Sequence, residues 1–282
     1  MQKLTISNLY IITIYNTEKE IKLFLLPMKI IVAPASFKGS LSNLESARVI
    51  KKACLDVFPD ADIVFFPVAD GGEGTADILK IILGGRFITE KIHNPVFRKI
   101  RGRWLKKGGT AYIEMAQAAG LTLLKDRERN PLRTTTYGVG ELIKSAVSSG
   151  VKEIFIGVGG SATNDGGIGA LIALGIRFIG KNQRSIYPGC GKDLADIKKI
   201  DASGLMPELQ KCRITILSDV KNPLFGKEGA AYIYAPQKGA DAYQVRLLDK
   251  GLRNYSRVIK MTTGRDISNL SGAGAAGGIV GG

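Results

Sequence analysis

The sequence has one histidine, His93, and three cysteines, Cys54, Cys190 and Cys212. The cysteines form no CxxC pair and no zinc-ligand spacing, so we expect reduced thiols in a cytoplasmic protein. A single histidine, which we expect to be structural, gives little support to an HExxH metal site or to a Cys–His or Ser–His nucleophile pair. We therefore expect any general base to be a carboxylate or a lysine.

Long apolar runs are also missing from the sequence. No run reaches the roughly 18 residues that a membrane-spanning helix needs, so no membrane partner is expected. Residues 1–27 contain a short apolar stretch without a small-residue cleavage site, which makes a poor signal peptide. Because the chain from Met28 reads as a natural start on a buried strand, we expect residues 1–27 to be a non-native extension.

The charge is unbalanced: 40 Lys and Arg against 25 Asp and Glu leave a net charge of +15. This positive charge has three alternative explanations. It favours binding to a nucleic acid, it favours binding to an anionic small substrate, or it is a general basicity of the protein without a specific role. The basic residues are scattered, and no zinc-finger motif or RNP-type aromatic motif accompanies them. We expect no nucleic-acid partner, although a nucleic-acid-binding protein stays open as a rival class.

The chain is long and apolar enough, at 282 residues and 45% apolar, for one large or two medium domains. Predicted strands alternate with predicted helices, which indicates an α/β fold with a mainly parallel sheet. We expect strands over 29–33, 63–66, 86–92, 99–105, 110–114, 154–158 and 213–217, and helices over 42–57, 75–83, 137–149, 168–174 and 241–260. Ser42 and Glu45 form a capping box at the start of the first helix.

The most informative stretch is residues 154–169, which read IFIGVGGSATNDGGIG. A β-branched strand opens into a polar glycine loop and then into a helix, which is typical of an anion site in α/β proteins. We expect the backbone N–H groups of Gly159, Gly160 and Ser161, through to Ala162, to bind a phosphate together with the helix N-terminus. Beside them in the loop, Asn164 is a candidate binding residue.

Three further polar, glycine-bearing segments follow predicted strands, at residues 34–40, 69–75 and 218–226. Loops at the carboxyl ends of parallel strands lie at one edge of the sheet, so these segments are expected to converge on one cleft with the loop at 157–167.

Their charged residues carry alternative interpretations. Lys38 is a phosphate contact or a solvated lysine. Asp70 and Glu73 hold Mg²⁺ or act as a base, or they serve turns and helix caps. Asp165 is a base or a helix cap, and Asp219 is a metal ligand, a base or a turn residue.

Standard nucleotide motifs are missing. No Gly-Lys pair is followed by Ser or Thr, so there is no Walker A sequence, and there is no HRD or DFG sequence of protein kinases. The string GVGGSA fits GxGxxA, but no acidic residue stands about 20 residues later to bind a ribose.

Taken together, the ordered strings resemble the class I glycerate kinases from Met28 to the last residue. The matching strings are APASFKGSLS, FPVADGGEGT, YIEMAQAAGL, RNPLRTTTYGVGELI, IGVGGSATNDGGIGALIALG, SDVKNPLFG, YAPQKGA and SGAGAAGG. The resemblance implies ATP- and Mg²⁺-dependent phosphorylation of D-glycerate, usually to 2-phosphoglycerate, with 3-phosphoglycerate as the other possible product. It also implies two α/β domains with mainly parallel sheets, the second inserted into the first.

On this basis we expect residues 28–94 to begin the first domain, 95–270 to form the inserted domain and 271–282 to be a glycine-rich crossover loop. The resemblance carries over these site residues: Ser36, Lys38, Asp70, Glu73, Asn164, Asp165 and Asp219. We expect Asp219 or Asp165 to deprotonate the glycerate hydroxyl, Asp70 or Glu73 to hold Mg²⁺, and Lys38 to contact phosphate. Arg133 is expected to hold the glycerate carboxylate.

The chain departs from the family pattern in three places. Ala35 stands where the family has Asp, Ser271 stands where it has Pro, and the family continues with a TGEGRxD motif beyond the last residue of this chain. An alternative expectation is therefore an inactive truncated remnant or one half of a split enzyme.

Overall fold

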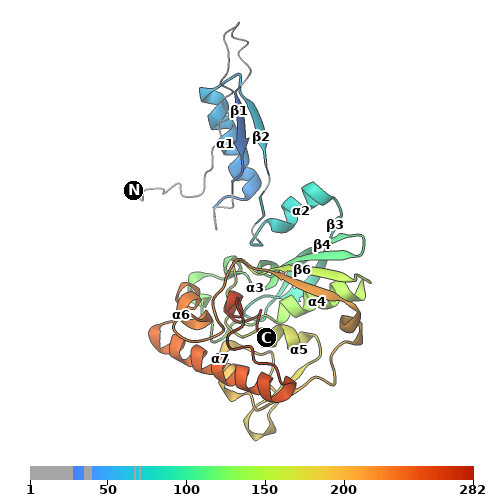
Figure 1. Cartoon of the computed structure of the whole chain (residues 1–282), viewed down its shortest axis with the longest axis vertical. Helices are drawn as coiled ribbons and strands as arrows, with labels where there is room; N and C mark the ends of the chain where they lie inside the picture. The colour runs from blue at the N-terminus through green and yellow to red at the C-terminus, as the bar shows by residue number, and fades with distance from the viewer. Residues whose placement is uncertain (1–27, 35–39, 67, 70) are drawn as a thin grey trace. The chain divides into compact units, whose positions relative to one another are not determined.

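The computed structural model describes residues 28–34, 40–66, 68–69 and 71–282. The chain divides into two compact units, Met1–Ala69 and Asp70–Gly282 (Figure 1). The assignment of residues 28–94 and 95–270 to two domains, one inserted into the other, stays a prediction.

The first unit contains a parallel strand pair and one helix. Strand β1 (Lys29–Val32) pairs with β2 (Asp62–Phe65), with Lys29 opposite Asp62. In the sequence, α1 (Asn43–Val57) connects the two strands, and it begins at the predicted Ser42 cap. The Ser42 N–H donates to a Glu45 carboxylate oxygen at 2.9 Å, and the Glu45 N–H donates to the Ser42 hydroxyl, so the predicted capping box is confirmed.

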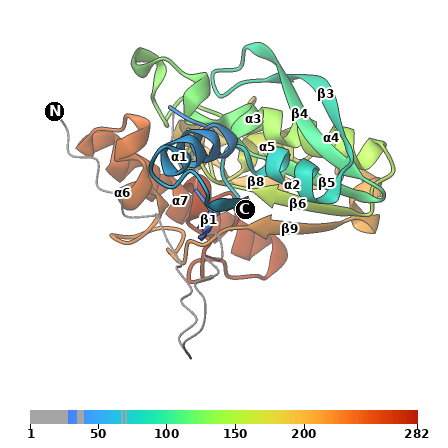
Figure 2. The same ribbon diagram turned by 90° about the horizontal axis from the view of Figure 1, so that it is seen from above.

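A five-stranded sheet forms the centre of the second unit, in the order β3-β4-β5-β6-β9. Its strands are β3 (Arg86–His93), β4 (Lys99–Lys107), β5 (Thr110–Glu114), β6 (Glu153–Gly157) and β9 (Arg213–Leu217). The β3–β4 and β4–β5 pairs are antiparallel, whereas the β5–β6 and β6–β9 pairs are parallel. Figure 2 shows β6 and β9 side by side. The predicted α/β class is therefore confirmed, and β5, β6 and β9 end at one edge of the sheet.

Helices cover both faces of this sheet. Adjacent residues of a strand point to opposite faces. On β4, the Trp104 indole N–H donates to Ser145 of α4 (Tyr137–Ser148) at 3.1 Å. The neighbouring Arg103 donates to Asp77 of α2 (Thr75–Leu83) at 2.8 Å. The two helices thus lie on opposite faces, and α4 covers the apolar one.

The core under α4 is closed to water. Trp104, Ile113, Ile154 and Leu142 are each at most 2% exposed. Burial of a side chain of this size contributes roughly 1.5–3 kcal/mol, so this cluster holds the strand ends in fixed positions beneath the glycine loop.

A second apolar cluster surrounds α7 (Ala242–Thr263), which begins at an Asp241–Gln244 capping box. The other helices and strands are α3 (Ala116–Ala119), α5 (Ile168–Ala173), α6 (Ala230–Tyr234), β7 (Arg177–Ile179) and β8 (Lys199–Asp201). Short 3-10 helices occupy Leu121–Leu123, Asp126–Glu128, Lys181–Gln183, Gly191–Asp196, Pro207–Lys211, Pro236–Lys238 and Ala275–Gly277. The antiparallel β7–β8 pair was not predicted from the sequence.

The three cysteines are free thiols. No helix in the described part of the chain has the length and apolar character that crossing a bilayer requires.

Candidate functional site

Two of the predicted glycine segments meet at the carboxyl end of β6. The Gly159 N–H donates to the Gly71 carbonyl oxygen at 3.2 Å. A Cβ on Gly157 would lie 2.3 Å from that same oxygen, and a Cβ on Gly159 would lie 2.7 Å from the Gly72 Cα. The backbone at Gly71 and Gly72 therefore crosses directly over the end of β6, and only glycine permits so close an approach.

The third segment, residues 218–226, leaves β9 beside this point, because Gly157 and Leu217 are partners in the parallel ladder. Residues near the C-terminus connect the loops. The Gly274 N–H donates to the Asn222 carbonyl oxygen, and the Gly166 N–H donates to the Gly277 carbonyl oxygen, both at 3.0 Å. The loops after β6 and β9 are thus joined through residues 274–277.

The fourth segment carries Ser36 and Lys38, and these two residues lie outside the described residues, as does Asp70. Their predicted roles stay predictions.

The glycine loop has two free backbone donors among the four that we predicted. The Gly159 N–H is used as described above, and the Ala162 N–H donates to the Ala119 carbonyl oxygen at 2.8 Å. Within the described part of the chain, the N–H groups of Gly160 and Ser161 have no acceptor. Gly160 is exposed and has a φ of 73°, a left-handed conformation that suits glycine. The N–H groups of Gly160 and Ser161 are therefore the two of the four that remain available to an anion.

The start of α5 does not supply the phosphate donors that we predicted for it. Its first-turn N–H groups already have acceptors inside the protein. The Gly167 N–H donates to an Asp165 carboxylate oxygen at 3.3 Å, and the Ala170 N–H donates to the Thr136 hydroxyl at 2.9 Å. The Ile168 N–H donates to the Asp165 carbonyl oxygen. That part of the prediction is wrong, because buried side chains satisfy the helix terminus first.

Asp165 lies in a wholly buried position. One carboxylate oxygen accepts both the N–H and the hydroxyl of Thr136, each at 2.7 Å. Burial raises the pKa of Asp165, and the hydrogen bonds from Thr136 and Gly167 oppose that rise. Its carboxylate thus connects the start of α4 to the glycine loop and the start of α5.

Asp219 is placed differently. It is exposed two residues beyond the end of β9. Burial, and after it the negative charge of Asp219, raises the pKa of Tyr234. The Tyr234 hydroxyl donates to the Asn222 side-chain oxygen at 2.7 Å, which holds the neighbouring loop. Asp219 is therefore a carboxylate open to a substrate at the same sheet edge as the glycine loop.

Glu73 follows the glycine pair that crosses β6. Its side chain is exposed, and one carboxylate oxygen accepts the Thr122 hydroxyl at 3.3 Å. Across the described residues, no three His, Cys, Asp or Glu side chains gather to hold a metal ion. Since Mg²⁺ in kinases is commonly held by one or two carboxylates and the substrate phosphates, Glu73 suits such a site.

The two remaining predicted residues flank the loop. Arg133 is exposed, and the hydroxyl of its neighbour Thr134 donates to the Ala162 carbonyl oxygen at 2.9 Å. Asn164 is wholly buried, and neither polar atom of its side chain has a hydrogen-bond partner within the described ranges. The structure thus brings both residues to the glycine loop, with Arg133 facing solvent and Asn164 enclosed.

Comparison with known proteins identifies the family. A family model described as the glycerate kinase family matches residues 30–282. The chain belongs to the glycerate kinase family. The predicted resemblance is confirmed.

Relatives with this family's name cover most of the chain. The glycerate kinase of Haemophilus influenzae is 46% identical over 90% of this chain and 68% of its own length. The glycerate 2-kinase of Escherichia coli is 45% identical over 89% of this chain and 66% of its own. A crystal structure from Salmonella typhimurium LT2, of a protein assigned as glycerate kinase 2, has a TM-score of 0.77 at 42% identity and covers 90% of this chain and 68% of that one.

The chain spans about two thirds of the length of the curated relatives that it matches. These relatives are named as kinases, so the prediction of an enzyme family is confirmed.

The sequence did not single out Lys238, which lies against the glycine loop. Lys238 is 2% exposed, and its ammonium group donates to the Ser161 hydroxyl at 2.8 Å and to the Thr163 carbonyl oxygen at 2.6 Å. Burial lowers the pKa of Lys238 to about 7, and the Asp165 carboxylate opposes that shift. The only signal in the sequence was its place in the string YAPQKGA.

Glu114, at the end of β5, also has a structural role. One of its carboxylate oxygens accepts the Ala76 N–H at 2.6 Å, in the first turn of α2. Burial raises the pKa of Glu114. Its side chain therefore caps α2 and holds the segment that carries Glu73.

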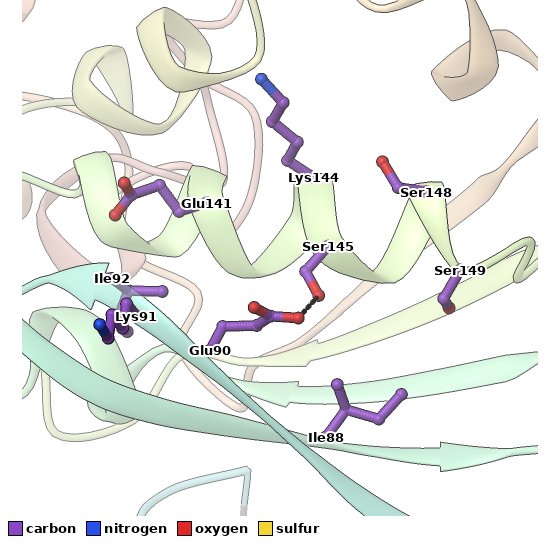
Figure 3. Close-up of a pocket in the computed structure, with 9 residues that line it drawn as sticks. All are labelled: Ile88, Glu90, Lys91, Ile92, Glu141, Lys144, Ser145, Ser148 and Ser149. Atoms are coloured by element: carbon purple, nitrogen blue, oxygen red, sulfur yellow. Dashed lines mark hydrogen bonds between the residues drawn. The ribbon is translucent and has the colours of Figure 1, made fainter.

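A separate groove of about 450 Å³ lies between β3 and α4 (Figure 3). Within it the Ser145 hydroxyl donates to Glu90 at 2.8 Å. The groove also contains Glu141, which pairs with the lone histidine, His93, at 3.0 Å. None of the predicted site residues lines this groove.

Proposed function

We propose that the protein is a cytoplasmic glycerate kinase that transfers the γ-phosphoryl group of ATP to D-glycerate, with Mg²⁺ as cofactor. The match to the glycerate kinase family over residues 30–282 is the observation that carries this proposal. The name of the Escherichia coli relative, glycerate 2-kinase, supports 2-phosphoglycerate as the product over 3-phosphoglycerate.

The free donors of the glycine loop support a phosphate site. Phosphoryl transfer depends mainly on positioning and on stabilising negative charge. The unpartnered N–H groups of Gly160 and Ser161 stand at the end of β6 and suit the oxygens of a nucleotide phosphate. By resemblance to the family, Lys38 and Ser36 are proposed phosphate contacts, and both lie outside the described residues.

Asp219 is the proposed base. Both carboxylate oxygens of Asp165 already accept hydrogen bonds, and its side chain is closed to solvent. Asp219 is exposed. In the proposed step, the Asp219 carboxylate takes the proton of the glycerate hydroxyl, and the hydroxyl oxygen forms a bond to the γ-phosphorus. The bond from that phosphorus to the bridging oxygen breaks, and ADP leaves with the electron pair.

Glu73, with Asp70 from the same segment, is the proposed holder of Mg²⁺. When bound, Mg²⁺ neutralises charge on the phosphate oxygens. Arg133 is exposed beside the loop and is proposed to bind the glycerate carboxylate, since a guanidinium pairs with both oxygens of such a group. The predicted contact of Asn164 with substrate stays a prediction, because its side chain is wholly buried in the loop.

The test is a coupled ADP-release assay on the purified chain with D-glycerate, ATP and Mg²⁺, and ³¹P NMR identifies the product. A second arm uses a version extended to the length of the relatives. D219N is expected to lower kcat by at least about 100-fold, because a general base contributes 10²–10⁴-fold. The matched control is D56N, which changes an exposed aspartate of α1 and is expected to leave kcat unchanged.

No turnover of D-glycerate in either arm contradicts the proposed function. Turnover only by the extended version identifies this chain as one part of the enzyme. Near-normal turnover by D219N contradicts the assignment of the base and leaves the function standing.

A further inference from the structure

The buried ammonium group of Lys238 lies directly against the glycine loop. It donates to the Ser161 hydroxyl at 2.8 Å and to the Thr163 carbonyl oxygen at 2.6 Å. These two contacts span 77 and 75 positions of the chain, so they depend on the tertiary structure and not on a local turn. Lysine is almost never fully buried unless its charge is compensated, so this position requires a physical reason.

The two contacts hold the loop on both sides of Ala162. The Ala162 N–H donates to the Ala119 carbonyl oxygen, and its own carbonyl oxygen accepts the Thr134 hydroxyl. With Lys238 on Ser161 and Thr163, three consecutive residues are held by hydrogen bonds. The free N–H groups of Gly160 and Ser161 stand at the start of this restrained stretch.

When it is protonated, Lys238 also favours an anionic ligand next to these donors. The attraction between charges falls with distance and is weakened less by a buried surrounding than by water. The Ser161 residue links both effects, since its hydroxyl accepts from Lys238 while its backbone N–H is free.

We propose that Lys238 is a positioning residue for the nucleotide, one that holds the Gly160–Ser161 donors in place for the ATP phosphates and, when protonated, adds positive charge behind them. This inference rests on the proposed function. It assigns Lys238 to the binding of ATP and not of D-glycerate. Removal of the Lys238 amine should therefore raise the KM for ATP and leave the KM for D-glycerate nearly unchanged.

The test compares K238M with K106M. Lys106 makes the same two kinds of contact, to the Ser149 carbonyl oxygen at 2.7 Å and the Ser149 hydroxyl at 3.3 Å, at the end of α4. K238M is expected to raise the KM for ATP at least about 10-fold and the KM for D-glycerate by less than about 2-fold. K106M is expected to change neither value by more than about 2-fold.

Binding of Mg²⁺–ADP, followed by calorimetry without D-glycerate, gives a second measurement. K238M should weaken it at least about 10-fold. If K238M does not fold by circular dichroism, S161A replaces it, because that change removes one of the two acceptors and leaves the backbone N–H in place. S161A should raise the KM for ATP about 3- to 10-fold.

An unchanged KM for ATP in folded K238M overturns the proposal, and so do equal rises in both KM values. If K238M weakens Mg²⁺–ADP binding while neither the chain nor its extended version turns over D-glycerate, the result supports the role of Lys238 and contradicts D-glycerate as the acceptor. The two failures are therefore distinguishable.

Discussion

The backbone N–H and the hydroxyl of Thr136 both donate to one carboxylate oxygen of Asp165, each at 2.7 Å. Both residues are wholly buried. The Thr136 hydroxyl also accepts the Ala170 N–H at 2.9 Å. This pair therefore holds the starts of α4 and α5 and the glycine loop together. Its loss should lower the free energy of unfolding more than it changes the catalytic rate.

We expect D165N to lower the free energy of unfolding by about 2–3 kcal/mol, because an amide keeps one acceptor oxygen and places its NH₂ group against buried donors. T136V, which removes only the hydroxyl, should lower the free energy of unfolding by about 1–2 kcal/mol. Because the two residues are in contact, the double variant should cost less than the sum. Urea denaturation measures each value.

The matched control is D126N, since the Asp126 side chain is 89% exposed and pairs with Arg129 at the surface. Surface changes of this kind usually stay within about 0.5 kcal/mol. If D165N is as mild as D126N, the buried carboxylate does not hold these elements together.

Gly159 should tolerate no side chain. A Cβ there would lie 2.7 Å from the Gly72 Cα, and backbone cannot move aside as a flexible side chain can. We expect G159A to lower the free energy of unfolding by about 1–3 kcal/mol through overpacking. It should also raise the KM for ATP at least about 10-fold, because the segment with Glu73 would be displaced from the loop.

G109A is the control for this change, as a Cβ on Gly109 meets no atom within 4 Å. Thermal unfolding and steady-state kinetics on both variants give the comparison. Equal behaviour of G159A and G109A would show that the close approach of Gly71 and Gly72 to β6 does not matter.

The pH dependence of stability should report the burial of Lys238. An unfolded lysine titrates near pH 10.4, whereas burial lowers the pKa of Lys238 to about 7 in the folded protein. Below about pH 7 both states are protonated, and the cost of burying the charge is present in full. Between about pH 7 and 10.4 the unfolded chain binds more protons, so the free energy of unfolding rises with pH.

K238M should lack this rise. The measurement is the difference between the unfolding free energies of the wild-type protein and K238M, taken by urea denaturation from about pH 6 to about pH 9. Using the difference cancels the other titrating groups that both proteins share. A difference that does not change with pH is the contradicting result.

The sequence by itself determined the local elements and the family. The helix over 75–83 and the strand over 213–217 match α2 and β9, and the capping box at Ser42 and Glu45 is present. These predictions succeed because helix caps, apolar periodicity and glycine positions act over a few neighbouring residues. The glycine loop and its order among the other strings indicated the family for the same reason.

Only the tertiary structure decided what each polar residue of the loop does. Asp165 and Asp219 look alike as aspartates near strand ends, yet one is enclosed by Thr136 and the other is exposed. Lys238 carries no local signal, because its acceptors are 75 and 77 positions away. Burial and hydrogen bonding between distant segments depend on how the chain packs, and these set which donors and charges remain for a substrate.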